Sequence, residues 1–232
     1  MMRYIKFTNI FWYIVCIIGV LCGVRAYQIT GQGMVDLYQL YHMLFGEIIL
    51  LALILPVFLG ITLSTVEKCQ NYSRILQHGS REKWFVETVK ELKNICVKYT
   101  LLLLAPADIV FIFHSGRSGE WFNGLYGMLS LFLYFGIFFS LSLLVFFIRL
   151  IWTAHVAGLF GAMLAVLLLE ILGRTGMFHR EVTFEGFINS LYLFSEGDYL
   201  WIRHGLCCGA VAVLALFIYR RIEYVAGVKD VL

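Results

Sequence analysis

Six long apolar stretches divide this chain, and each is long enough to cross a membrane as a helix. A helix needs about 20 mainly apolar residues to span the hydrocarbon core of a bilayer. The apolar runs are continuous and do not alternate with polar residues, which excludes a membrane β-barrel. The sequence therefore predicts an all-α polytopic membrane protein, with residues 1–232 forming a single transmembrane domain. The six predicted spans are residues 10–27, 42–64, 95–113, 125–148, 150–173 and 204–219.

One long polar segment, residues 65–98, interrupts the apolar pattern between the second and third predicted spans. Its remaining apolar residues recur at helical spacing in two groups, before and after the sequence His78-Gly79-Ser80-Arg81-Glu82. Gly79 suits the position just past a helix end, where a positive φ is needed, and Ser80 suits the N-cap of the next helix. Lys83 and Glu87 have the spacing of an i,i+4 ion pair. The pattern predicts a basic helix–turn–helix, which we name the coupling segment.

The composition agrees with a membrane domain. The chain is 61% hydrophobic with a mean hydropathy of +0.84, and 14% of its residues are charged, against about 25% in soluble domains. No part outside the spans is large enough to fold as a soluble domain. The six cysteines show no paired CxxC spacing, so we interpret them as small buried apolar residues and not as disulfides or zinc ligands. They are Cys16, Cys22, Cys69, Cys96, Cys207 and Cys208.

The basic residues predict the orientation, because Lys and Arg accumulate on the cytoplasmic side of membrane proteins. With both termini in the cytoplasm, five basic residues lie on the outer side: Arg25, Arg117, Arg174, Arg180 and Arg203. The remaining thirteen lie on the inner side: Arg3, Lys6, Lys68, Arg74, Arg81, Lys83, Lys90, Lys93, Lys98, Arg149, Arg220, Arg221 and Lys229. We therefore expect six spans with both termini and the coupling segment in the cytoplasm.

The outer connection between the fifth and sixth predicted spans, residues 174–203, is amphipathic. Its apolar residues fall on one helical face, which predicts a helix that lies in the membrane interface or re-enters the membrane. These residues are Phe184, Phe187, Ile188, Leu191 and Phe194.

Three carboxylates are predicted at membrane depth, and such groups are functional-site hypotheses because burying a charge in a bilayer is costly. We expect Asp108 and Glu170 to lie close enough to the outer water to be solvated. Glu47 lies a few residues below the outer surface, where it either lines a transport pathway or extends its carboxylate to the interface.

An intramembrane serine protease is one alternative. Gly116-Arg117-Ser118-Gly119 matches the GxSG motif of rhomboid proteases, and the sequence around His155 resembles their histidine-bearing helix. One predicted span separates Ser118 from His155, which puts about 30 Å of bilayer between a nucleophile and a base that must be in contact. We therefore expect no catalytic residue in this chain. The histidines show no metal-ligand spacing and no phosphate-binding GxxxxGK[ST] loop is present, so we predict no metal site and no cofactor in this chain.

The layout and the loop resemble the ABC-2 type permease family, the membrane subunits of bacterial ABC exporters. The features that carry the resemblance are six spans, cytoplasmic termini and the basic loop of residues 67–84, which contains a Gly79-Ser80-Arg81 turn. In that family the loop forms a coupling helix that docks on a cytosolic ATPase, and interfacial or re-entrant helices lie between the fifth and sixth spans. The resemblance implies a cytosolic ATPase partner that holds ATP and Mg²⁺, and a second permease subunit, identical or not. It also implies the cytoplasmic membrane of a bacterium and a hydrophobic or amphipathic substrate such as an antimicrobial peptide.

On this interpretation the ATPase contact is made by six residues of the coupling segment: Arg74, His78, Gly79, Ser80, Arg81 and Trp84. Trp84 would be an apolar anchor and Arg81 a partner for acidic groups, with Gly79 and Ser80 setting the turn. Two alternatives stay open, an amphipathic loop that binds lipid headgroups and a non-catalytic membrane scaffold. We expect no nucleic-acid partner.

Overall fold

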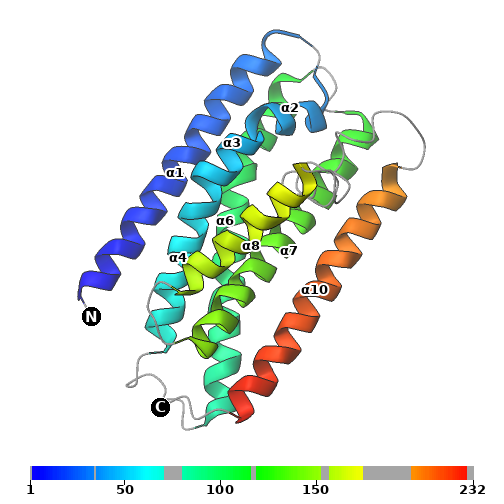
Figure 1. Ribbon diagram of the computed structural model, residues 1–232. Helices are drawn as coiled ribbons and strands as arrows, with labels where there is room; N and C mark the ends of the chain where they lie inside the picture. Colours follow the sequence, from blue (N-terminus) through cyan, green and yellow to red (C-terminus); the bar gives the residue numbers. More distant parts are fainter. Residues whose placement is uncertain are drawn as a thin grey trace.

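The computed structural model describes residues 2–33, 35–70, 80–115, 119–152, 157–174 and 200–228, and these residues are all-helical with no strand. Figure 1 shows the helices in chain order. They are α1 (Met2–Thr30), α2 (Leu37–Leu44), α3 (Glu47–Ile49), the π-helix η1 (Leu50–Ile54), α4 (Leu55–Cys69), α6 (Arg81–His114), α7 (Trp121–Ile151), α8 (Ala157–Arg174) and α10 (Leu200–Val228). The predicted all-α fold is confirmed.

Four helical stretches within the described residues are long and apolar enough to cross a membrane: Asn9–Thr30, Leu50–Cys69, Glu82–His114 and Asn123–Ile151. They correspond to the first four predicted spans, so the chain has the character of a multi-pass membrane protein. Helices α8 and α10 cover most of the fifth and sixth predicted stretches. Residues 175–199, which hold most of the predicted amphipathic connection, lie outside the described residues.

The second predicted span, residues 42–64, is not one continuous helix. Helix α2 ends at Leu44, and Phe45 and Gly46 are not helical before α3 begins at Glu47. The π-helix η1 follows, and the Tyr99 hydroxyl donates a hydrogen bond to the Ile54 carbonyl oxygen at 2.6 Å. The hydropathy of residues 42–64 did not reveal this break, because apolar residues dominate on both sides of Gly46 and Glu47.

Two other helix ends differ from the prediction. Helix α6 continues without a break from the polar residues at Arg81 to His114, so the third predicted span is the far part of a 34-residue helix. Helix α7 passes the predicted turn at Arg149 and ends at Ile151. The Arg149 guanidinium donates to the Trp152 carbonyl oxygen at 3.2 Å, which satisfies an acceptor beyond the helix end.

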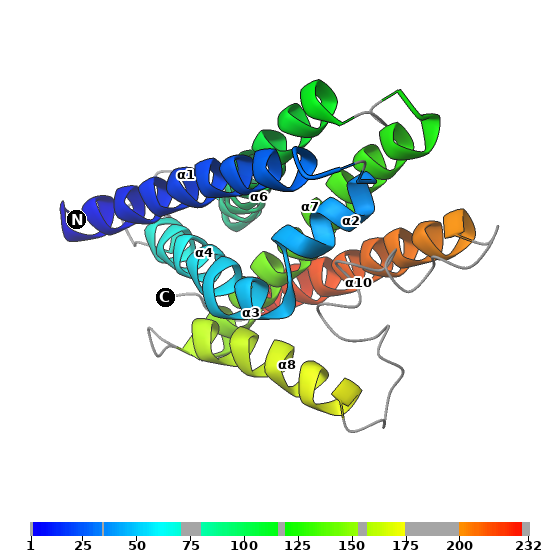
Figure 2. The ribbon, with the colours of Figure 1, turned by 90° about the horizontal axis from the view of Figure 1, so that it is seen from above.

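The helices form an elongated bundle in which α1 packs against α6 and α4, and α7 packs against α6 and α10 (Figure 2). Helix α1 begins, α4 ends, α6 begins and α10 ends at the lower end of Figure 1. We call this the turn end, because the ends of α4 and α6 that flank the predicted turn lie there. Helix α1 ends, α2 begins, α6 ends and α7 begins at the opposite end.

Helices α1 and α6 approach each other closely at glycine. A Cβ atom on Gly19 would lie 2.5 Å from the Leu102 carbonyl oxygen, and one on Gly23 would lie 3.2 Å from Pro106 Cβ. Small residues four apart are typical of helix contacts in membranes, where close backbone packing replaces the hydrophobic effect. The other side of α1 exposes large apolar residues to the surroundings, including Tyr13, Ile17 and Val20.

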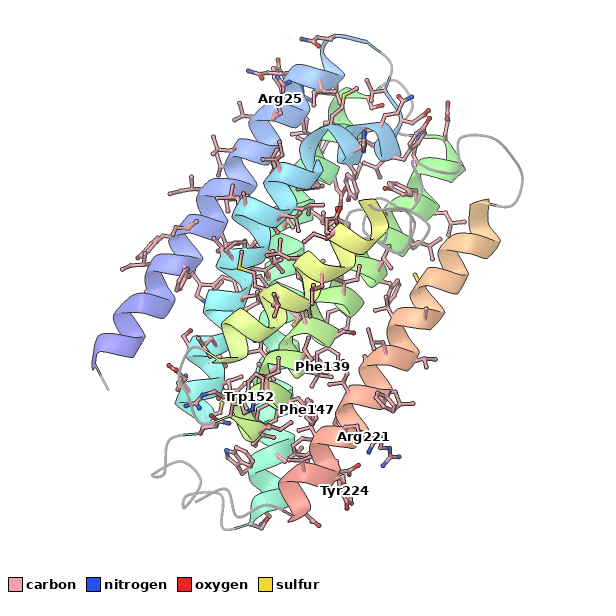
Figure 3. The ribbon with its side chains drawn as sticks, in the orientation of Figure 1. Arg25, Phe139, Phe147, Trp152, Arg221 and Tyr224 are labelled. Atoms are coloured by element: carbon pink, nitrogen blue, oxygen red, sulfur yellow. The ribbon has the colours of Figure 1, made fainter. Side chains whose placement is uncertain are left out.

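Aromatic and basic residues gather at the turn end. Figure 3 shows Trp152, Arg221 and Tyr224 there, with Arg25 at the opposite end of the bundle. Trp152 and Tyr224 are mostly exposed, and the Arg221 guanidinium lies over the Phe217 ring at 5.3 Å. Exposed Trp and Tyr side chains with nearby Arg are typical of a membrane–water interface.

Candidate functional site

The first residues of α6 bound the predicted coupling turn. Ser80 has extended backbone angles (φ −150°, ψ 151°), and its hydroxyl accepts a hydrogen bond from the Lys83 backbone N–H at 3.3 Å. The prediction that Ser80 is the N-cap is confirmed, and the cap satisfies one of the unpaired N–H groups that begin every helix. Arg81 is the first helical residue, and its side chain lies outside the described part. Arg74, His78 and Gly79 also lie outside the described residues.

Trp84 lies in the interior and not on the surface. Its side chain is 1% exposed, its ring contacts Phe146 of α7 with centroids 5.8 Å apart, and its Nε1–H donates to the Cys69 carbonyl oxygen at 2.7 Å. We therefore correct the sequence interpretation of Trp84 as an exposed anchor for a partner. The reason is geometric: the indole completes a contact between three helices, which a sequence pattern does not reveal.

The Trp84 contact joins the end of α4 to the beginning of α6. Cys69 is the last residue of α4, so its carbonyl has no partner within the helix and the indole N–H supplies one. The Cys69 thiol also donates toward the Glu91 carboxylate at 3.6 Å. These two contacts fasten α4 and α6 to each other next to the turn. The predicted Lys83–Glu87 pair is replaced by a pair between Glu87 and Lys90 at 3.5 Å.

A second polar feature lies near the opposite end of the bundle. The buried Tyr41 hydroxyl of α2 donates a hydrogen bond to the Asp108 carboxylate of α6 at 2.5 Å. Asp108 is partly buried and its carboxylate accepts a hydrogen bond from a phenol, and its expected contact with the outer water stays a prediction. Glu170 is 5% exposed, so the expectation of a solvated Glu170 is wrong. Glu47 begins α3 directly after the break, and its side chain lies outside the described part.

Aromatic rings surround the Tyr41–Asp108 pair. The Tyr41 ring lies 5.6 Å from Phe45 and 5.6 Å from Tyr126, and 6.3 Å from Tyr134, between ring centroids. Phe45 and Tyr134 are 5.9 Å apart. We name the five residues Tyr41, Phe45, Asp108, Tyr126 and Tyr134 the aromatic–carboxylate cluster. The carboxylate at membrane depth was a visible signal in the sequence, but its phenol partner lies 67 positions away and could not be paired with it.

Ser118 and His155, the residues of the protease alternative, both lie outside the described residues. Within the described residues, no group of three or more His, Cys, Asp or Glu side chains could hold a metal ion.

No family model, curated protein or solved structure matches this chain. The two polar features, the capped turn at one end and the aromatic–carboxylate cluster near the other, are therefore the basis for an assignment of function.

Proposed function

We propose that this chain is the membrane-spanning permease subunit of a bacterial ATP-driven exporter of the ABC-2 type. It acts in the cytoplasmic membrane with a separate cytosolic ATPase, which holds ATP and Mg²⁺, and with a second permease subunit. The observation that carries the proposal is the fastening of α4 to α6 by Trp84 and Cys69 next to the turn. A force applied to a turn built in this way moves two membrane helices together.

The length of α6 supports this mechanism. Its 34 residues form one helix, which at 1.5 Å per residue is about 50 Å long. It extends from the turn through the third predicted span, residues 95–113, which contains Asp108. When the ATPase subunits close on ATP, displacement of the turn would tilt α6 and α4 as rigid bodies between two packed arrangements.

The arrangement of the helix ends favours six spans with cytoplasmic termini. Helix α1 begins and α10 ends at the turn end, as an even number of crossings requires. The exposed Trp152 and Tyr224 mark a membrane interface at that same end, and the basic residues of the coupling segment fit the cytoplasmic side. Helices α8 and α10 supply the fifth and sixth spans.

The ATPase contact falls on Arg74, His78, Gly79, Ser80 and Arg81, with Trp84 beneath them as a positioning residue. Lys83 is exposed beside this contact, so the turn presents positive charge to an acidic groove on the partner. Complementary charge of this kind gives specificity and fast association. The substrate class is hydrophobic or amphipathic, because the outer surfaces of the helices and the interior are both apolar.

The competing functions receive less support. A Ser118–His155 catalytic pair would have to contact across the length of α7, whose 31 residues extend about 45 Å between the two motifs. In a scaffold or a lipid-binding loop the buried indole would serve packing alone, and capture of the ATPase distinguishes this from a coupling role.

The test is capture of the ATPase from membranes of the host organism, with the chain carrying an affinity tag. Arg81→Glu reverses one charge beside the turn and should remove most of the captured ATPase, because like charges facing each other at an interface cost several kcal/mol. The matched control is Lys93→Glu, a charge reversal at an exposed position three turns further along α6. Equal ATPase recovery with Arg81→Glu and Lys93→Glu would reject the coupling role.

A further inference from the structure

Asp108 is an incompletely satisfied carboxylate inside the bundle. It lies six residues before the end of α6, about 9 Å along the helix axis. Among the described residues its one hydrogen-bond donor is the Tyr41 phenol, and no Lys, Arg or His side chain pairs with it. A carboxylate accepts several hydrogen bonds, and at membrane depth an ionisable group is normally paired or functional. The Tyr41 phenol is a neutral donor, so the Asp108 carboxylate could still accept further hydrogen bonds and pair with a positive charge.

The phenol that binds this carboxylate is packed among aromatic rings. Tyr41, Phe45, Tyr126 and Tyr134 are all buried, and their rings contact one another around Tyr41. The face of an aromatic ring attracts a cation, and the attraction is strongest where water is excluded. The Tyr134 hydroxyl is buried and has no hydrogen-bond partner among the described residues. A buried hydroxyl without a partner is costly, so this oxygen is a second group in the cluster that a polar ligand would satisfy.

Helix α2, which carries Tyr41, is a short helix that is not continuous with the long helices of the bundle. It has eight residues, and non-helical residues bound it on both sides, at 31–33 and 35–36 and at Phe45–Gly46. The Tyr41 hydroxyl donates to Asp108 and joins α2 to α6, and the Leu37 backbone N–H donates to the Asn123 side chain at 3.0 Å and joins α2 to α7. Irregular backbone within a membrane protein is tolerated where it lies inside the protein or lines an aqueous path. Non-helical breaks and π-helices are also frequent at functional sites.

We propose that the aromatic–carboxylate cluster is a binding site for an organic cation, a protonated amine or a quaternary ammonium group. The inference rests on the proposed function and gives the transported substrate a positive charge. In the structure described here Tyr41 closes the site and occupies Asp108. When α2 moves away with Tyr41 and the adjoining Phe45, the cation replaces the phenol at the Asp108 carboxylate and lies against the rings of Tyr126 and Tyr134 on α7.

The test uses the purified full chain in lipid nanodiscs and benzyltrimethylammonium as the probe, with binding measured by calorimetry. The wild type should bind the probe saturably, and Asp108→Asn should weaken binding by about tenfold or more, because the ion pair is lost while the shape is kept. Tyr41→Phe should bind at least as tightly as the wild type, because it removes the competing phenol and keeps the ring. A purely structural Tyr41–Asp108 contact would give no saturable binding in any of the three proteins. Glu223→Gln removes an exposed carboxylate that pairs with Arg220 and is the control that should leave binding unchanged.

A second measurement needs no substitution and so does not depend on whether Asp108→Asn folds. A hydrophobic carbodiimide modifies intramembrane carboxyl groups, and mass spectrometry measures the rate at Asp108. Benzyltrimethylammonium should slow this rate, and its uncharged isostere neopentylbenzene should not. An equal rate with and without the cation would overturn the proposed site.

A failure of the proposed cation site can be distinguished from a failure of the proposed permease function. Asp108→Asn should capture the ATPase as well as the wild type, since Asp108 lies near the other end of α6 from the turn. If the ATPase is captured and no cation binds, the site inference fails and the permease function stands. If Arg81→Glu and Lys93→Glu capture equal amounts of ATPase, the permease function fails whatever the cation does.

Discussion

Trp84→Phe tests whether the turn transmits movement to α4 and α6. The substitution keeps an aromatic ring against Phe146 and removes the Nε1–H that donates to Cys69 at 2.7 Å. The carbonyl of Cys69 then becomes a buried acceptor without this partner at the end of α4. Such a loss costs about 1–3 kcal/mol, and hydrogen bonds within membrane proteins fall near the lower end of that range. We expect the chain to fold with a reduced unfolding temperature.

Trp84→Phe should reduce the ATP-induced response of the helices more than it reduces the stability of the folded chain. With α4 no longer fastened to α6, ATP-driven closure of the partner would move the turn without tilting both helices. The ATPase should still be captured, because the surface of the turn is unchanged. Coupling between two sites is typically worth about 1–3 kcal/mol, so its loss should reduce the ATP-induced response about fivefold or more.

The assay needs no knowledge of the substrate. Gly33 lies in the connection at the end of the bundle opposite the turn, and a Cβ atom there meets nothing within 4 Å. In proteoliposomes that contain the ATPase, the rate at which a membrane-impermeant maleimide labels Gly33→Cys should change on addition of ATP. That change should be lost in Trp84→Phe.

Thr88→Val is the matched control. The Thr88 hydroxyl is buried one turn from Trp84 and donates to the Trp84 carbonyl oxygen at 2.8 Å, within the same helix. Its removal affects stability on α6 and leaves the link to α4 intact. If Trp84→Phe and Thr88→Val change the ATP-induced labelling equally, the indole does not couple the turn to the helices and the reasoning is refuted.

Three further predictions follow from the arrangement of the chain. A cysteine introduced at Gly186 should react with an impermeant maleimide only from outside the cell, because residues 174–203 are predicted to lie on the outer side; labelling only from the cytosol would reverse the topology. Gly19→Ala should lower the unfolding temperature, since its Cβ would lie 2.5 Å from the Leu102 carbonyl oxygen and overpacking costs about 1–3 kcal/mol; Gly33→Ala is the control, and an equal temperature for both would refute the close α1–α6 contact. Ser118→Ala should leave ATPase capture and ATP-induced labelling intact, whereas loss of proteolysis of a membrane substrate in this variant would favour the protease alternative.

Local sequence signals predicted the helices and one of their caps. Apolar periodicity and length are properties of neighbouring residues, so they located four spans and the beginning of α6, where Ser80 caps the helix. The cap could be predicted because the hydroxyl and the N–H that it accepts from are only three residues apart.

Features that depend on distant residues could not be predicted in the same way. The break at Phe45–Gly46 lies in a mainly apolar run whose length and hydropathy are those of an ordinary span, and Gly46 and Glu47 were the one local signal of it. In the sequence Trp84 follows a basic turn and so looks like a surface anchor for a partner. It is buried because its ring packs on Phe146 and its indole N–H donates to the Cys69 carbonyl oxygen. Asp108 was visible as a carboxylate at membrane depth, but its partner Tyr41 is distant in the sequence and is brought to it by the packing of α2 on α1 and α7.

The most direct test of the central claim is photocrosslinking from the turn itself. A photoreactive amino acid in place of His78, with the tagged chain and stoichiometric ATPase in inverted membrane vesicles, should give a covalent adduct with the ATPase on irradiation. The same amino acid in place of Lys93, exposed on α6 away from the turn, should give little or none. An ATPase adduct that is much stronger at position 78 than at position 93 is the result that the account predicts. Equal adducts at the two positions, or adducts at position 78 to lipid alone, would contradict it.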